Sequence, residues 1–346
     1  MVRRGSHPRL SVILVVEGSP SYAMRALESI QNQDLYDLQI VVVCRDVAPG
    51  VRHSLEVAAG RDIHIDLIDV EDAARGACLR AGFAASRGSQ IIPTNADEWF
   101  APQSLSKMVD TACDAAADIV FPTVSLDRYD AHRERHSRVL DAAPLAIEGH
   151  SSMARELAQL IPSGLIAQTS GVMYSRSLFD ACLSHDKTYR TVGFMACALS
   201  RAQRVSGCGD ARFHAVAPKL TEVFDPTMFA RLSDDVRALD ELTGSLAEAG
   251  DGGQLKVVSQ KFYFAGLVAC IENLCLSPHG VSSIERSARM RDMLEAPRTR
   301  QMVAALKDDH RGLGLLFGPI ASARPTRCVM CTHLAAFLNR TGAKTA

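Results

Sequence analysis

Up to about residue 125, the chain alternates short runs of β-branched residues with stretches of helical periodicity. The strand-like runs are 11–16, 38–44, 63–68, 90–93 and 118–121. Between the first two, the apolar residues Tyr22, Ala26, Leu27 and Ile30 recur at helical spacing. Strands that alternate with helices predict a mostly parallel sheet with helices on both faces. Ligands of such sheets bind beyond the carboxyl ends of the strands, which directs attention to residues 17–18, 45–46 and 95–97.

The pattern changes twice further along the chain. Residues 126–150 are polar and rich in Arg and His, which is typical of an exposed hairpin or loop. From Leu220 onward the strand signals fade and helical stretches dominate. We expect helices at about 228–249, 254–276, 283–307 and 328–340. The sequence therefore predicts an α/β domain over 9–220 and a helical C-terminal subdomain over 221–346.

Composition excludes several classes of protein. The 346 residues are 47% hydrophobic and 22% charged, as in an ordinary folded protein. The 38 Lys and Arg nearly balance the 39 Asp and Glu, so no overall field favours a nucleic-acid partner. The longest apolar stretch, 262–276, contains Glu272 and Asn273 and is shorter than the roughly 20 residues of a membrane-spanning helix. Ten scattered cysteines favour a reducing, cytoplasmic location. A position at the periphery of the membrane is compatible with this location.

Several ordered motifs carry a resemblance to a known family. The strand 11–16 is followed by Leu27-Glu-Ser-Ile-Gln-Asn-Gln33 and the strand 38–43, and later by Ile91-Ile-Pro-Thr-Asn-Ala-Asp-Glu-Trp99. In this order and spacing the chain resembles the family 2 glycosyltransferases of the GT-A fold. The resemblance implies a mixed, mostly parallel sheet flanked by helices. It also implies transfer of a sugar from a nucleotide-diphosphate donor to a cell-envelope or polysaccharide acceptor, either a glycan or a lipid-linked molecule.

The resemblance also implies a divalent cation, Mn²⁺ or Mg²⁺, bound by an Asp-x-Asp triplet beside the donor diphosphate. Here the triplet is Asn95-Ala96-Asp97, so Asp97 keeps the carboxylate and Asn95 offers only an amide oxygen. We therefore expect weak or no cation binding, because an amide contributes no charge. A simpler interpretation is that Asn95 and Asp97 cap the next helix.

Three further positions correspond to donor contacts in the family but carry other residues. These candidates for nucleotide-sugar binding are Glu17 after the first strand, Asp46 after the second, and Arg80 before Gly82. Asp46 could contact the base of the nucleotide and Arg80 the diphosphate. For both, an ordinary exposed charge is the competing interpretation.

The proton acceptor is the least defined part of the predicted site. An inverting transfer needs a base for the acceptor hydroxyl, and the corresponding stretch 191–193 contains no acid. Asp186 is the nearest upstream candidate, with a surface role as its alternative. These departures from the family leave a second hypothesis open, namely a catalytically inactive GT-A-like domain with a binding or assembly role.

Other signals are weaker. Cys328, Cys331 and His333 have a spacing compatible with zinc, but a helix face explains them as well. Basic residues of 128–138 could hold an anionic acceptor or simply cover a solvated hairpin. His214 is interpreted as a core histidine with a satisfied hydrogen bond rather than as a late metal ligand.

Overall fold

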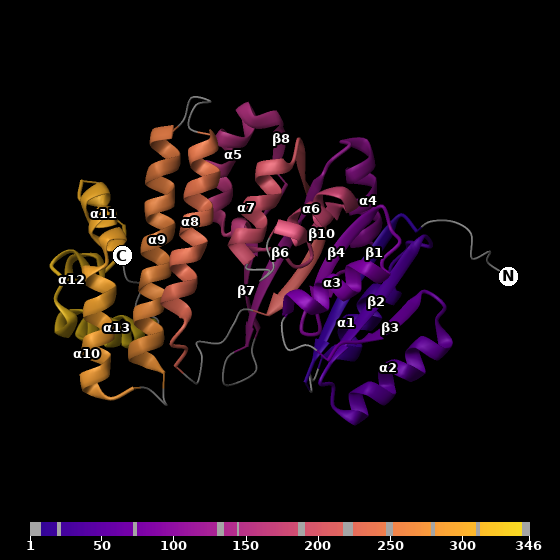
Figure 1. Ribbon diagram of the computed structural model, residues 1–346, viewed down its shortest axis with the longest axis horizontal. Helices are drawn as coiled ribbons and strands as arrows, with labels where there is room; N and C mark the ends of the chain where they lie inside the picture. The colour runs from indigo at the N-terminus through magenta and orange to yellow at the C-terminus, as the bar shows by residue number, and fades with distance from the viewer. Residues whose placement is uncertain are drawn as a thin grey trace. The chain divides into compact units, whose positions relative to one another are not determined.

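The computed structural model describes residues 8–18, 22–71, 75–129, 135–143, 145–185, 191–216, 224–246, 252–277, 281–308 and 312–340. The chain divides into two compact units, Met1–Ala217 and Pro218–Ala346. In the described residues, all strands belong to the first unit and the second unit is helical (Figure 1). The predicted α/β sheet and the predicted C-terminal helical region are both confirmed.

One sheet organises the first unit, with the order β3-β2-β1-β4-β9-β6-β10-β5. The strands are β1 (Leu10–Glu17), β2 (Leu38–Arg45), β3 (Ile65–Asp69), β4 (Gln90–Asn95), β5 (Trp99–Phe100), β6 (Ile119–Tyr129), β9 (Met173–Ser175) and β10 (Arg204–Val216). Strands β3, β2, β1 and β4 pair in parallel. The short β9 is antiparallel to both β4 and β6, so β6 runs in the direction of β4, and β10 pairs in parallel with β6. The carboxyl ends of β1, β2, β3, β4, β6 and β10 therefore share one edge, which we call the carboxyl edge.

Helices cover this sheet because its central strands are apolar on both faces. All but the last residue of β1 and of β2 are buried, as expected for parallel strands between two helical layers. The helices of this unit are α1 (Ala23–Gln31), α2 (Pro49–Arg61), α3 (Arg75–Ala85), α4 (Ser104–Asp114), α5 (Gly149–Ser163), α6 (Arg176–His185) and α7 (Thr191–Arg201). Helix α1 buries Ala26, Leu27 and Ile30, as predicted from their spacing, together with Ala23, whereas the predicted Tyr22 lies at the N-cap and is exposed.

Gly82 allows α3 to approach the sheet closely. A Cβ added at this position would lie 2.4 Å from Ile13 Cγ2 and 3.0 Å from Val43 Cγ2. Any side chain there would push the helix away from β1 and β2. The glycine of the family motif thus has a packing role in this chain.

Of the two structures expected for residues 126–150, a hairpin or a loop, the first part forms a hairpin, and the later part contains β8 (Ala146–Glu148) and the start of α5. Residues Val124–Tyr129 of β6 pair with Arg135–Leu140 of β7, and β7 (Arg135–Leu140) is exposed at every position except Leu140. Strand β8 then pairs with β10. The two- and three-residue strands β5, β8 and β9 were not predicted, because so few residues cannot show a periodicity, and the 13-residue strand β10 was also missed.

The second unit packs around one long central helix. Its helices are α8 (Met228–Leu246), α9 (Gly252–Leu276), α10 (Ser283–Glu295), α11 (Pro297–Leu306), α12 (Phe317–Ala321) and α13 (Pro325–Arg340). Helix α9 contacts α8, α10, α11 and α13 (Figure 1), and its Leu267, Ile271 and Leu274 are fully buried. In the part of the chain that the structure describes, no helix combines the length and the apolar character needed to cross a membrane.

The prediction of a single helix over 283–307 is wrong. The chain leaves the helix at Ala296, where ψ is 137°, and α11 begins at Pro297. The cause is local, because the proline ring excludes the helical conformation for the preceding residue while favouring the first position of the new helix.

Candidate functional site

Glu17 and Arg45 end the two adjacent strands β1 and β2 at the carboxyl edge. They are register partners, and Arg45 Nη2 lies 2.7 Å from Glu17 Oε2. The second carboxylate oxygen, Glu17 Oε1, is buried and accepts no hydrogen bond from the described residues. Asp46 follows with a positive φ of 49° and is exposed. The sequence predicted Glu17 and Asp46 at this edge, but not that Arg45 neutralises Glu17.

The Asn95–Glu98 turn follows β4, the other neighbour of β1. The backbone N–H of Ala96 donates to Val15 O at 3.1 Å, which ties the turn to β1. Asp97 is exposed at this turn, whereas Glu98 is buried. The next helix, α4, begins at Ser104 after Gln103, so the interpretation of Asn95 and Asp97 as its caps is wrong.

Glu98 is the centre of a buried polar cluster. Its Oε2 accepts hydrogen bonds from the Asn95 backbone N–H and from Asn95 Nδ2, both at 2.9 Å, from Thr94 Oγ1 at 3.3 Å, and from Ser170 Oγ. Burial raises the pKa of Glu98, and the charge of Asp97 raises it further, against hydrogen bonds that lower it. The Asn95 side chain therefore donates a hydrogen bond to this buried carboxylate, a role that the sequence did not indicate.

The residues of this turn set a limit on cation binding. Within the described residues, no three His, Cys, Asp or Glu side chains gather as a metal site. Four donors occupy Glu98 Oε2, and the Asn95 amide nitrogen belongs to the same cluster, so the oxygen ligands left at this turn are the exposed Asp97 carboxylate and the Asn95 amide oxygen. Mg²⁺ commonly binds to one or two carboxylates together with substrate phosphates. The donor set fits a cation of that kind only when the diphosphate supplies the other oxygens.

Trp99, two residues after Asp97, is stacked against two side chains. The His214 ring lies parallel to it at 4.8 Å between centroids, and the Arg25 guanidinium carbon lies 3.6 Å from its centroid. Arg25 Nε and Nη2 are buried and have no hydrogen-bond partner in the described part of the chain. A buried guanidinium with unused donors is suited to an anion.

His214 is held by a buried carboxylate. Its Nδ1–H donates to Asp127 Oδ2 at 3.0 Å, and Asp127 is fully buried. Burial alone would raise the pKa of Asp127, but hydrogen bonds from Ser137 and His214 and the charges of His214 and Arg135 lower it. Asp127 is therefore ionised, and its contact selects, for a neutral His214, the tautomer with the proton on Nδ1. Both residues lie toward the carboxyl ends of their strands, β6 and β10, on the same edge as Asn95.

Two residues of the motif 27–33, Ser29 and Gln33, hold the segment around Trp99 in place. Ser29 Oγ accepts from the Phe100 backbone N–H at 3.2 Å, and Gln33 Nε2 donates to Ala101 O at 3.0 Å. Gln33 Oε1 in turn accepts from the Leu105 N–H at 3.1 Å. The motif therefore fastens α1 to the segment that contains Trp99.

The other predicted residues lie elsewhere. Arg80 is exposed midway along α3, a helix that packs on β1 and β2. Asp186 falls in 186–190, outside the described residues. On α13, Cys328 is buried whereas His333 is exposed, which separates two of the three proposed zinc ligands. On β7, Arg135, His136 and Arg138 are exposed, and Arg135 Nη1 lies 3.9 Å from Asp127 Oδ2.

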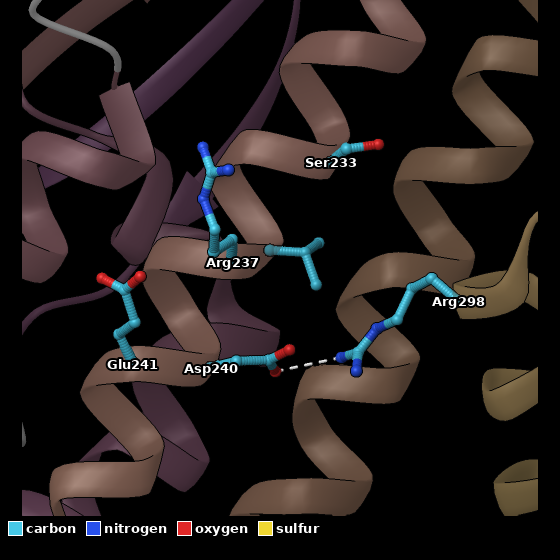
Figure 2. Close-up of a pocket in the computed structure, with 6 residues that line it drawn as sticks. Ser233, Arg237, Asp240, Glu241 and Arg298 are labelled. Atoms are coloured by element: carbon cyan, nitrogen blue, oxygen red, sulfur yellow. Dashed lines mark hydrogen bonds and ion pairs between the residues drawn. The ribbon is translucent and has the colours of Figure 1, made fainter.

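A separate cavity of about 420 Å³ lies in the helical unit (Figure 2). It is lined by Ser233, Val236, Arg237, Asp240, Glu241 and Arg298. Arg298 Nη2 lies 3.0 Å from Asp240 Oδ1, which also accepts from Ser259 Oγ at 2.8 Å. This ion pair links α8, α9 and α11, so we interpret it as structural; no predicted site residue lines the cavity.

Comparisons with known proteins agree with this architecture. The family model described as glycosyl transferase family 2 matches residues 11–183. A protein of Bacillus subtilis (strain 168) named as a candidate glycosyltransferase, EpsH, is 29% identical over 132 residues, which are 38% of this chain and 38% of EpsH. Two structures of S. aureus TarS 1–349 are similar in fold. The complex with UDP gives a TM-score of 0.62 at 13% identity, covering 96% of this chain and 92% of that one. The complex with UDP-GlcNAc gives a TM-score of 0.57 at 13% identity, covering 98% of this chain and 93% of that one.

Proposed function

This chain belongs to glycosyl transferase family 2, and we propose that it transfers a sugar from a nucleoside-diphosphate donor bound at the carboxyl edge of its sheet. The donor would lie across the ends of β2, β1 and β4, where Asp46, Glu17 and Asp97 follow three adjacent parallel strands. Binding at this edge is the general rule for open parallel sheets.

The observation that carries this proposal is unused hydrogen-bonding capacity next to β1. Glu17 Oε1 is a buried acceptor, and Arg25 Nε and Nη2 are buried donors, without partners in the described residues. Buried polar atoms are costly unless they are paired, so such groups at the end of β1 and in the first turn of α1 indicate a ligand that pairs them. A nucleotide sugar offers N–H and O–H donors for the carboxylate and phosphate oxygens for the guanidinium.

The cation, Mn²⁺ or Mg²⁺, would be held by the Asp97 carboxylate and the Asn95 amide oxygen, while Asn95 Nδ2 stays bonded to Glu98. When bound, such an ion neutralises the charge of the leaving diphosphate. Arg80 would add a positive charge on the α3 side of the donor, and Asp46 would accept a hydrogen bond from the base. Because the chain provides one free carboxylate at this turn, we expect cation affinity to depend strongly on the nucleotide.

For the acceptor hydroxyl, His214 oriented by Asp127 is a proton acceptor with defined geometry. The ionised Asp127 holds Nδ1–H, so Nε2 can take the proton, and the resulting imidazolium is stabilised by the same carboxylate. Asp186 is the second proposed base. A change at Asp127 should shift the pH profile of transfer, whereas a change at Asp186 should do so only if that residue is the base.

We propose that residues 9–220 contain the catalytic machinery and that residues 221–346 form a helical subdomain. The proposed acceptor is a cell-envelope or polysaccharide glycan, or its lipid-linked form, used in the cytoplasm at or near the membrane. The exposed Arg135 and Arg138 on β7, with the polar His136 between them in sequence, favour an acceptor with negative charge.

Two observations favour the second candidate, an inactive domain that binds or assembles. Arg45 occupies Glu17 in an ion pair of 2.7 Å, and position 95 carries an amide committed to Glu98. Both features reduce the acidic character expected of a donor site.

Ligand binding separates the two functions. The chain is heated with UDP, GDP, CDP and dTDP, each with and without Mn²⁺, and the melting temperature is recorded. A ligand at a hundred times its Kd stabilises the native state by about 2.7 kcal/mol. We expect one nucleoside diphosphate with Mn²⁺ to stabilise the chain, and Asp97→Ala to remove the Mn²⁺-dependent part, while Asp114→Ala on the exposed end of α4 leaves it unchanged. If no nucleotide stabilises the chain, the transferase proposal is abandoned in favour of the inactive domain.

A further inference from the structure

The C-terminal part of the chain has an unusual charge distribution. Residues 311–346 contain no Asp or Glu, but they contain Arg311, Arg324, Arg327, Arg340 and Lys344. Since the whole chain has a net charge of −1, the first 310 residues carry −6 and the last 36 carry +5. Positive charge is therefore concentrated in residues 311–346 of the sequence, whereas residues 1–310 have a net negative charge.

Helix α13 (Pro325–Arg340) occupies this segment and has two distinct faces. One face packs against α9, α10 and α12, and buries Cys328 and Thr332. The opposite face exposes Met330 (67%), Leu334 (49%) and Phe337 (63%). Their spacing of four and three residues places them in one stripe along the helix. Large apolar side chains gathered in this way on a surface mark an interaction site.

Cationic and polar residues border the stripe. Arg327 precedes Met330 by one turn and is exposed, as are Arg324, Thr326 and His333. Leu315, 46% exposed, adds an apolar side chain in the same acid-free segment. An exposed apolar stripe with Arg324 and Arg327 at its N-terminal end, in a segment without acids, can lie in the interface of an anionic bilayer. At 16 residues and about 1.5 Å per residue, α13 is about 24 Å long, suitable for lying along a membrane rather than across it.

We propose that α13 docks the protein on an anionic phospholipid surface, with Met330, Leu334 and Phe337 inserted at the level of the headgroups and Arg324 and Arg327 contacting lipid phosphates. Charge selects this occupant. A second copy of the chain would bring the +5 segments of two molecules together, whereas an anionic bilayer complements them. The proposal deepens the membrane location given under the proposed function, but it does not depend on sugar transfer, because vesicle binding and nucleotide binding are measured separately.

The test is co-sedimentation of the full chain with vesicles of phosphatidylcholine, with and without 30% phosphatidylglycerol, at low and high salt. We expect at least ten-fold stronger binding to the anionic vesicles, and loss of most of that difference at high salt. Met330→Gln/Leu334→Gln should weaken binding at least five-fold without changing charge. Arg324→Gln/Arg327→Gln should weaken it and reduce its salt dependence.

Ile284→Gln is the matched control. Ile284 is 82% exposed on α10, outside the acid-free segment, so its replacement should leave vesicle binding unchanged. Circular dichroism and melting temperature confirm that each variant is folded, which is expected because all the altered side chains are exposed. The proposal is overturned if the full chain does not bind anionic vesicles more strongly than neutral ones, or if Ile284→Gln weakens vesicle binding as much as the α13 variants do. It is also overturned if Met330→Gln/Leu334→Gln dissociates a dimer in light scattering but leaves vesicle binding intact.

Discussion

Replacement of Asn95 by Asp would restore the acidic triplet typical of the family, but the structure predicts that it destabilises the fold instead of simply creating a metal site. Asn95 Nδ2 donates to Glu98 Oε2 at 2.9 Å. A hydrogen bond to a charged group is worth about 1.5–3 kcal/mol, and Asn95→Ala should lose that amount. In Asn95→Asp, a second carboxylate would stand about 3 Å from the first, adding repulsion of about 5 kcal/mol at an effective dielectric constant of 20.

Proton uptake limits this repulsion and gives the prediction its pH dependence. Two carboxylates at this distance share one proton, so the pair has a raised pKa in the folded state compared with the unfolded chain. The folded state then binds a proton that the unfolded state has lost, and the free energy of unfolding falls as pH rises. We expect Asn95→Asp to resemble Asn95→Ala at pH 5 and to be about 2–5 kcal/mol less stable at pH 8.

Trp99, the single tryptophan of the chain, reports unfolding of this region in urea titrations at pH 5, 6, 7 and 8. Asn95→Ala is the matched control, because it removes the same hydrogen bond without adding charge. Equal stability of Asn95→Asp and Asn95→Ala at pH 8 would refute the contact with Glu98. Saturating Mn²⁺ should recover part of the loss in Asn95→Asp only if position 95 faces the donor site.

Three other outcomes follow from contacts in the first unit. Glu98→Gln should stabilise the protein at pH 7 and make its stability less dependent on pH above pH 5. Because the pKa of the buried Glu98 is raised, the wild type loses stability as pH rises through that pKa. Urea titrations of both proteins, with Ser170→Ala as the comparison, measure the difference in stability. Gly82→Ala should cost about 1–3 kcal/mol in thermal unfolding, because the new Cβ meets Ile13; no loss would contradict the close helix approach. A double-mutant cycle of Glu17→Gln and Arg45→Met should give a coupling of about 1 kcal/mol that decreases in salt, and zero coupling would show that the pair does not form.

The functional residues divide according to the range of the contacts that define them. Asp97 could be located from the sequence because it directly follows a buried strand, and that local pattern fixes which edge of the sheet it occupies. The role of Asn95 could not, since it depends on Ser170, 75 residues away, and on Glu98 turning inward. The stack of Arg25, Trp99 and His214 was also missed, because it joins α1, β5 and β10.

The sequence by itself determined the alternation of strands and helices, the polar stretch after residue 125, the helical C-terminal region and the family motifs. Hydrophobic periodicity and turn chemistry act over a few residues, so they are legible in a single chain. Tertiary structure decided which charges became neutralised and which stayed available. Glu17 meets Arg45 only because β1 and β2 pair in that register, and Asp127 meets His214 only because β10 lies beside β6. A shift of one residue in either pairing would turn those side chains to opposite faces of the sheet, which is why the strand register, and no local pattern, fixes the chemistry of this edge.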